Sequence, residues 1–262
     1  MWQRVAAAAR CDRGSRAALP LRARVMAPLV ALLAACLAAV AEGTYTFDEL
    51  PATAQWMVGP PPQDVEVEGG WLRISPVGGT DLWRTTYYDP PFINYNAHVM
   101  CLPGISGPAA AGGRDGILQA TLKVDPVNQF DQGGIFVGVD DHHWTKVGIE
   151  YSDESSRLSI VNTEGFSSWF TRALPAPDAA VDVKLYRVRD ALLLEWRLAG
   201  LEEEYELVAI VHQALVGRHD VVVGLFAAAP TAVGGAVLFD GVSWRPCPGT
   251  GACHAHGAGD GG

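Results

Sequence analysis

The sequence predicts an all-β protein, a two-sheet antiparallel sandwich or jelly roll with about 12 strands. Between residues 44 and 244 the dominant hydrophobic pattern has a period of two, and Gly, Pro, Asp and Asn separate the candidate strands. No ten-residue segment of this body has a convincing helical stripe, and a parallel α/β sheet would need helical crossovers. With 262 residues, 49% of them hydrophobic, the chain can bury one sizeable core.

The strands are expected where the alternation is clearest. Residues 65–75, VEVEGGWLRIS, alternate on both sides of a Gly-Gly pair, which indicates two strands joined by a tight turn. Residues 181–188, VDVKLYRV, alternate well but not perfectly. The other expected strands are 97–102, 117–124, 134–139, 144–151, 158–163, 192–198, 205–211, 220–227 and 237–244.

Two segments inside this body are expected to be irregular. Residues 86–96, TYYDPPFINYN, contain paired prolines and predict a long loop, and the Gly/Pro/Ala-rich residues 103–116 predict an exposed, mobile insertion. We therefore expect one sandwich domain over residues 45–246, followed by a disordered Gly-rich Cys/His tail over residues 247–262.

Residues 1–43 have the composition of a leader. Six Arg and one Asp precede an apolar run that ends in Ala-Val-Ala, which is typical of a secretory signal. The run is shorter than the roughly 20 residues of a membrane span. A start at Met26, an organelle transit sequence and a lipoprotein motif ending at Cys36 are alternatives. A secreted or membrane-anchored protein is favoured, with an organelle or the cytoplasm as alternatives and no membrane span in the mature domain.

Charge and cysteine content exclude two classes of protein. The formal net charge is -10 and no basic stripe is present, so a nucleic-acid partner is not expected. Cys11 and Cys36 lie in the leader, and the remaining Cys101, Cys247 and Cys253 allow at most one disulfide. The chain is therefore not a disulfide scaffold.

Three motifs carry a resemblance to a known family. GTDLWRTTYYD (79–89), DQGGIFVGVDDHHWTKVGIEY (131–151) and LSIVNTEGFSSW (158–169) resemble the DUF1349 family, in order and within a match running from about Phe47 to Trp244. The resemblance implies a concanavalin A-like lectin/glucanase fold. The family is largely uncharacterised, and one namesake relative is described as a regulator of enolase. The chain departs from the family in its leader, its insertion and its tail.

The middle motif is expected to form a hairpin whose register follows from burial. If Val137 faces Thr145 and Ile135 faces Val147, these apolar residues and Ile149 share the core face. The loop is then Asp140-Asp141-His142, or five residues if Val139 and His143 do not pair. The opposite face suits an exposed groove, and it carries Gly134, Phe136, Gly138, Trp144, Lys146, Gly148 and Glu150.

The acidic and histidine residues at 140–143 could be a turn or a metal site. A turn is favoured because Asp in a turn bonds its own backbone and adjacent residues rarely converge on one ion, and Ca²⁺ is the alternative. The tail pattern C-x5-C-H-x-H has no standard zinc spacing. We expect no metal site and no cofactor.

A binding site is expected on the groove face of the hairpin. Aromatic rings stack on the apolar C–H faces of sugars, while charged groups bond the hydroxyls. The candidate ligand-binding residues are Trp83, Arg84, Phe136, Trp144, Lys146, Glu150 and Trp169. Alternatively, the tryptophans pack in the core and the charged residues form an ordinary solvated face. The expected partner is a glycan or sugar-like small molecule; a metabolic enzyme bound by the same face or by the 86–96 loop is the alternative.

No catalytic residues are expected. Glucanases of this fold carry two carboxylates on one strand in an E-x-D-x-E or E-x-D-x-x-E pattern, and neither occurs here. Glu202, Glu204 and Glu206 alternate at the start of a strand and are best explained as a charged edge. The sequence therefore predicts a non-catalytic binding module, with an atypical glycoside hydrolase as a further alternative.

Overall fold

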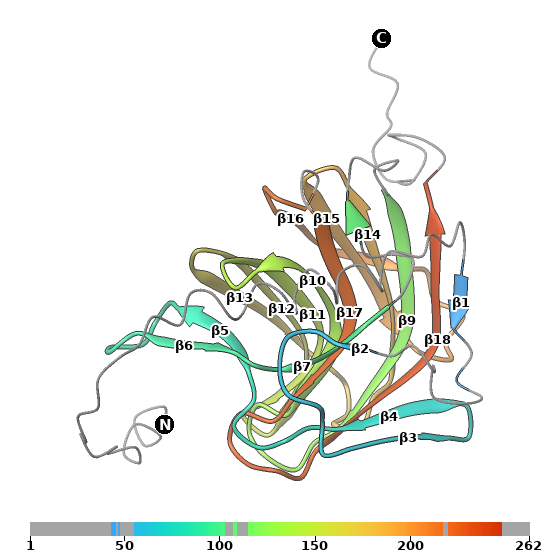
Figure 1. Ribbon diagram of the computed structural model, residues 1–262. Coiled ribbons are helices and arrows are strands. Elements are labelled where there is room, and N and C mark those ends of the chain that lie inside the picture. Colours follow the sequence, from blue (N-terminus) through green and yellow to red (C-terminus); the bar gives the residue numbers. More distant parts are fainter. Residues whose placement is uncertain are drawn as a thin grey trace.

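The computed structural model describes residues 43–45, 47, 55–102, 107–108, 115–216 and 220–247 (Figure 1). Within these residues the chain is all-β, and two large antiparallel sheets pack face to face, which confirms the predicted sandwich. The leader, most of the 103–116 insertion and the tail beyond Cys247 lie outside the described residues. A search of the described residues finds no helix with the length and hydropathy needed to cross a membrane.

Sheet A contains eight strands. They are β1 (Gly43–Tyr45), β3 (Asp64–Glu68), β4 (Trp71–Ser75), β9 (Gly116–Asp125), β14 (Val181–Val188), β15 (Ala191–Leu198), β16 (Glu206–His212) and β18 (Ala236–Pro246). Their order is β16-β15-β14-β9-β18-β4-β3, and β1 pairs with β18.

Sheet B also contains eight strands. They are β2 (Gln55–Trp56), β7 (His98–Cys101), β8 (Gly107–Pro108), β10 (Gln132–Asp140), β11 (His143–Ser152), β12 (Ser155–Glu164), β13 (Ser167–Ala173) and β17 (Asp220–Ala228). Their order is β13-β12-β11-β10-β17-β7-β2, and β8 pairs with β17. A separate hairpin is made by β5 (Leu82–Thr85) and β6 (Phe92–Tyr95).

The expected strands are all present, and six further strands were not expected. Four of these are β1, β2, β8 and β13. The edge strand β13 is largely exposed beyond Ser167, so its sequence shows no clear buried face. The other two are β5 and β6. The prediction of a continuous long loop over residues 86–96 is therefore wrong, because Phe92–Tyr95 pair with Leu82–Thr85.

The main core lies between the two sheets. The predicted inner face of the β10–β11 hairpin is confirmed, since Ile135, Val137, Val147 and Ile149 are all buried there. A second, smaller core covers the outer face of sheet B, where the β5–β6 hairpin packs. Its buried members are Leu82, Ala97, Val99, Phe136, Trp144, Val161, Phe226 and Ala228. Sheet B is therefore buried on both faces near β10 and β11.

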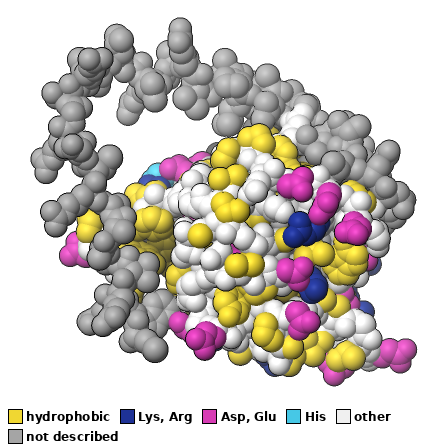
Figure 2. All heavy atoms as spheres, turned by 90° about the horizontal axis from the view of Figure 1, so that it is seen from below, with side chains coloured by type: hydrophobic (Ala, Val, Ile, Leu, Met, Phe, Trp, Pro, Cys, Tyr) yellow, Lys and Arg dark blue, Asp and Glu magenta, His cyan; other side chains and the backbone are white. Residues whose placement is uncertain are grey.

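Cysteine pairing and surface charge agree with the composition. Cys101 and Cys247 are both disulfide-bonded, within the limit of one bond set by the three cysteines that follow the leader. On the face shown in Figure 2, acidic side chains are scattered among apolar and neutral ones, and few basic side chains accompany them. This face offers no concentrated positive charge for a polyanion.

Candidate functional site

The β10–β11 hairpin has the register expected from burial. Ile135 pairs with Val147 and Val137 with Thr145. The turn is tighter than expected, however. Asp140 pairs with His143, and the register shifts between Gly138 and Asp140, so the turn itself is only Asp141-His142. The predicted three-residue loop is thus corrected to a two-residue turn beside a bulge.

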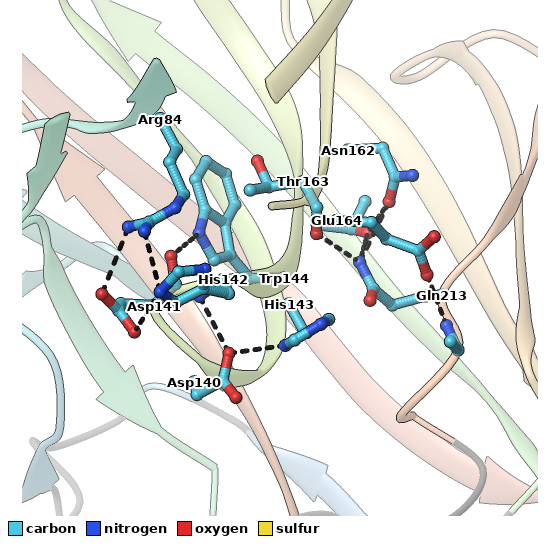
Figure 3. A network of polar contacts seen from close by, with 12 residues as sticks. Arg84, Asp140, Asp141, His142, His143, Trp144, Asn162, Thr163, Glu164 and Gln213 are labelled. Carbon is cyan, nitrogen blue, oxygen red and sulfur yellow. Dashed lines mark hydrogen bonds and ion pairs between the residues drawn. The ribbon is translucent and has the colours of Figure 1, made fainter. Parts of the chain in front are cut away.

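The charged residues of this turn make polar contacts with one another and with Arg84 of β5 (Figure 3). Asp140 Oδ1 accepts hydrogen bonds from the His142 amide and from His143 Nδ1, both at 2.8 Å. Arg84 Nη1 donates to Asp141 Oδ2 at 3.3 Å, and Arg84 Nη2 lies 2.7 Å from His142 Nε2. In the part of the chain that the structure describes, no three His, Cys, Asp or Glu residues are grouped to hold a metal ion.

Two of the candidate ligand contacts need correction, because the groove face of the hairpin is covered rather than exposed. Phe136 is 0% and Trp144 1% exposed, and their rings stack with centroids 6.4 Å apart. Trp144 also donates from Nε1 to the Asp141 carbonyl at 3.3 Å. These two rings are part of the second core, so they support the site from below and cannot contact a ligand directly.

A cavity of about 420 Å³ opens beside this second core, between sheet B and the β5–β6 hairpin. It contains four of the seven candidate residues, namely Trp83, Lys146, Glu150 and Trp169. Arg84 does not line it and instead ties β5 to the β10–β11 turn. The complete lining is Asp81, Trp83, Thr86, Tyr87, Tyr88, Phe130, Gln132, Lys146, Glu150, Val161, Ser167, Ser168 and Trp169.

Glycines leave the space above the middle of β11 empty. Lys146 and Glu150 point to the same face of β11, and Gly148 lies between them. Gly148 pairs with Gly134 of β10, and a Cβ on Gly148 would lie 2.0 Å from the Gly133 carbonyl oxygen. The two strands approach too closely there for any side chain, so the neighbouring Lys146 and Glu150 have room on either side of a bare backbone.

Three polar side chains form one part of the cavity floor. Lys146 Nζ donates to Gln132 Oε1 at 2.5 Å and lies 3.5 Å from Asp81 Oδ1. Gln132 Nε2 donates to the same Asp81 oxygen at 3.1 Å, and so does the Leu82 amide at 2.7 Å. Lys146 is only 3% exposed, and a buried ammonium requires such partners. The network holds the start of β5 against sheet B.

Glu150 forms the other part of the floor. Its Oε2 accepts a hydrogen bond from Ser159 Oγ at 2.7 Å, and Ser159 Oγ in turn accepts one from Trp169 Nε1 at 2.9 Å. Burial raises the pKa of the Glu150 carboxyl, and Asp81 raises it further, while Lys146 and the Ser159 hydrogen bond oppose the shift. Glu150 thus positions Trp169 through Ser159 and keeps a carboxyl group at the cavity wall.

Aromatic rings form the rim of the cavity. Tyr88 lies edge-on to Trp83 and to Tyr87, with centroid distances of 6.2 and 5.5 Å, and 5.4 Å from Phe92. Trp83 Nε1 donates to the Thr86 carbonyl at 3.0 Å, which orients its ring. Tyr87 is 79% exposed. The rim is therefore apolar and accessible, whereas the floor is polar and buried.

Sequence reasoning missed several lining residues, among them Asp81, Tyr88, Phe130 and Gln132. Asp81 and Tyr88 lie in the same motif as Trp83, so they could have been predicted as site residues from that motif. Gln132 pairs directly with Glu150 across the hairpin, which the predicted register would also have placed on the groove face. Phe130 lies before β10, where the strand pattern gives no information on direction.

The family comparison covers most of the described chain. A family model described as "Protein of unknown function (DUF1349)" matches residues 56–247. The Saccharomyces cerevisiae protein named "Regulation of enolase protein 1" is 34% identical over 110 residues, which cover 42% of this chain and 50% of the relative. An uncharacterised protein of Emericella nidulans is 25% identical over 113 residues, which cover 41% of this chain and 56% of the relative. The aligned segment thus spans about half the length of these curated relatives.

Solved structures give the same architecture. A functionally unknown protein from Saccharomyces cerevisiae is 26% identical with a TM-score of 0.61, covering 75% of this chain and 97% of that one. The GH43B protein of a Bacteroides ovatus xyloglucan locus is 13% identical with a TM-score of 0.55, covering 79% and 39%. A xylan β-1,4-xylosidase from Bacillus halodurans is 16% identical with a TM-score of 0.55, covering 79% and 38%. The last two likenesses show the fold alone.

Proposed function

This chain belongs to the DUF1349 family, whose function is unknown, and we propose that it is a non-catalytic module that binds a carbohydrate or sugar-like ligand in the cavity beside β11. The observation that carries the proposal is one cavity with aromatic walls and a buried polar floor. Sugar rings present apolar C–H faces and a belt of hydroxyls, so a site for them needs both kinds of surface. The cavity volume of about 420 Å³ falls in the range of small-molecule sites.

Each group in the cavity has a role in this proposal. Trp83 on β5 and Trp169 on β13 are half-buried and both line the cavity, so they offer ring surfaces for stacking. Lys146 and Glu150 are nearly immobile because of their hydrogen bonds, so they can accept or donate to hydroxyls without a large loss of side-chain entropy.

A glycan array followed by calorimetry tests this function. Trp169→Ala should weaken binding of a glycan from the array about tenfold or more, because it removes one wall of the cavity. Phe170→Ala is the matched control, since Phe170 is the next residue of β13, is 57% exposed and lies outside the cavity. Equal affinities of the two variants, or no binding on the array, would count against the proposal.

A second candidate function is regulation of a metabolic enzyme through a protein interface. The name of the yeast relative and an exposed apolar cluster on the rim support it. Tyr87, Tyr88 and Phe92 are 79%, 45% and 40% exposed, and aromatic residues are enriched at interfaces. Affinity capture with the wild-type chain should recover an enzyme that Phe92→Ser loses. This function is abandoned if no partner depends on Phe92.

A third candidate is an atypical glycoside hydrolase. Asp81 and Glu150 line the same cavity, and the raised pKa of Glu150 is a property of general acids. Hydrolysis of a panel of aryl glycosides by the wild-type chain, absent in Glu150→Gln, would support this activity. Full activity in the variant would remove Glu150 from any catalytic role.

We also propose that the protein is secreted or membrane-anchored. The Arg-rich leader supports this location, and so do the disulfide-bonded Cys101 and Cys247, because disulfides persist in oxidising compartments. Sequencing the N-terminus of the mature protein tests it. A start near Glu42 would support secretion and would exclude a cytosolic enzyme as the working partner, whereas an uncleaved chain in the cytoplasm would refute it.

A further inference from the structure

The charged groups that line the cavity do not balance. They are Asp81, Lys146 and Glu150. Lys146 Nζ lies 3.5 Å from Asp81, and its charge also acts on Glu150. One ammonium therefore serves two carboxyl groups, and with both of these ionised the cavity is one positive charge short.

One oxygen of Glu150 has no hydrogen-bond partner among the described residues. Oε2 accepts from Ser159, whereas no hydrogen bond to Oε1 is made in the described part of the chain. The residue is 7% exposed and lines the cavity, and Oε1 is not one of the buried atoms that lack a partner, so this oxygen is open to the cavity. A ligand donor that replaces water at Oε1 would make a charge-assisted hydrogen bond.

Neighbouring strands do not supply the missing charge. The cross-strand partners of Glu150 are Gln132 on β10 and Arg157 on β12. Gln132 is neutral, and Arg157 donates from Nε to the Ser152 carbonyl at 3.4 Å instead of pairing with Glu150. The loop after β5 and strand β13 contribute Tyr88, Trp169 and serines to the cavity, and none of these is a cation.

Tyr88 lines the same cavity as these carboxyl groups. Burial raises the pKa of its phenol, and the negative charges of Asp81 and Glu150 raise it further. The phenol thus lies in the field of the same two carboxyl groups. The surrounding rings of Trp83, Tyr88 and Trp169 also favour positive charge in the cavity, because the faces of aromatic rings attract cations.

From this charge balance we propose that the cavity selects an amine-bearing ligand, a sugar-like ring with a protonated amino group that binds Glu150 Oε1. The inference rests on the proposed function for the sugar ring, while the selection of the amine depends only on the carboxyl groups and aromatic walls. Glu150 is then the residue that determines specificity, and Lys146 with Asp81 holds the opposite part of the floor.

Calorimetry on the full chain with paired sugars tests this selectivity. The probes are glucose against glucosamine and galactose against galactosamine, at a pH at which the amines are protonated. We expect at least one amino sugar to bind about tenfold tighter than its parent sugar, the gain typical of one charged hydrogen bond. N-acetylglucosamine, whose amide is neutral, should lose this advantage, and this comparison needs no variant.

Two variants separate the site from general attraction to a chain with a net charge of -10. In Glu150→Gln the ratio of the two affinities should fall to about one, whereas the control Glu68→Gln, exposed on β3, should keep the wild-type ratio. Equal affinity for amino and parent sugars in the wild-type chain would overturn the amine selectivity and leave the sugar site intact. Binding of choline without binding of any sugar would support the cation site and overturn the sugar function. No binding of any probe would overturn both.

Discussion

Replacing Trp144 by Ala should destabilise the fold rather than remove a ligand contact. Trp144 is 1% exposed and packs in the second core against Phe136 and Tyr95, at ring centroid distances of 6.4 Å in both cases. Deleting a buried Trp side chain costs about 3–5 kcal/mol. Losing the hydrogen bond from Nε1 to the Asp141 carbonyl adds about 1 kcal/mol. The sum, roughly 4–6 kcal/mol, is a large part of the 5–15 kcal/mol that stabilises a typical domain.

Urea denaturation of the wild type, Trp144→Ala and Trp169→Ala measures this effect. We expect a large fall in the denaturation midpoint for Trp144→Ala and a small one for the half-buried Trp169. Trp169→Ala should instead affect ligand binding. A loss below about 1 kcal/mol for Trp144→Ala, combined with weakened sugar binding, would refute the assignment of Trp144 to the core and restore it as a contact residue.

Three other predictions concern buried groups. Because the pKa of Glu150 is raised, the folded chain keeps a proton on this carboxyl group at a pH at which the unfolded chain has lost it. The contribution of Glu150 to the free energy of unfolding therefore falls as pH rises above about 4.5. Denaturation of Glu150→Gln at several pH values should not show this fall. Burial lowers the pKa of His98, so the contribution of this residue to the free energy of unfolding is lost as pH falls below about 6.5. In His98→Gln, the free energy of unfolding should depend less on pH in that range. Gly148→Ala should cost roughly 1–3 kcal/mol, because the added methyl would lie 2.0 Å from the Gly133 carbonyl oxygen; an unchanged melting temperature would contradict this.

The sandwich and the hairpin register were predictable because burial leaves a strong mark on a strand. A shift of β11 by one residue would turn Val147 and Ile149 away from the main core, so the burial of these residues fixes the pairing with β10. The bulge between Gly138 and Asp140 was not predictable, since Gly138 looks no different in the sequence from Gly134 and Gly148, which pair without a shift in register.

The cover over the outer face of sheet B was not predictable from local pattern. Phe136 and Trp144 are buried by a hairpin that comes from about 50 residues earlier in the sequence. The prolines and aromatics between Thr86 and Asn96 hid its second strand. The outer face of the β10–β11 hairpin was therefore predicted to be an open groove. Part of this face is buried in the second core, and the rest lines the cavity.

The polar part of the site was only partly predictable. Lys146 and Glu150 were expected on one face, and both line the cavity. The identity of the acid beside Lys146 depends on a long-range contact, because Asp81 is 65 residues away and the chain has 29 acidic residues to choose from. Whether these side chains bind a ligand stays a prediction.

The positions of β17 and β18 have a consequence for the synthesis of the chain. β18 lies between β9 and β4 in sheet A, and β17 lies between β10 and β7 in sheet B. The last two strands of the described residues are therefore interior strands, one in each sheet. While the ribosome is still translating residues before Asp220, the earlier strands expose two unfilled gaps with unpaired edges. Neither sheet can close before β17 and β18 have left the ribosome, so until then the nascent chain exposes strand edges at which aggregation can begin.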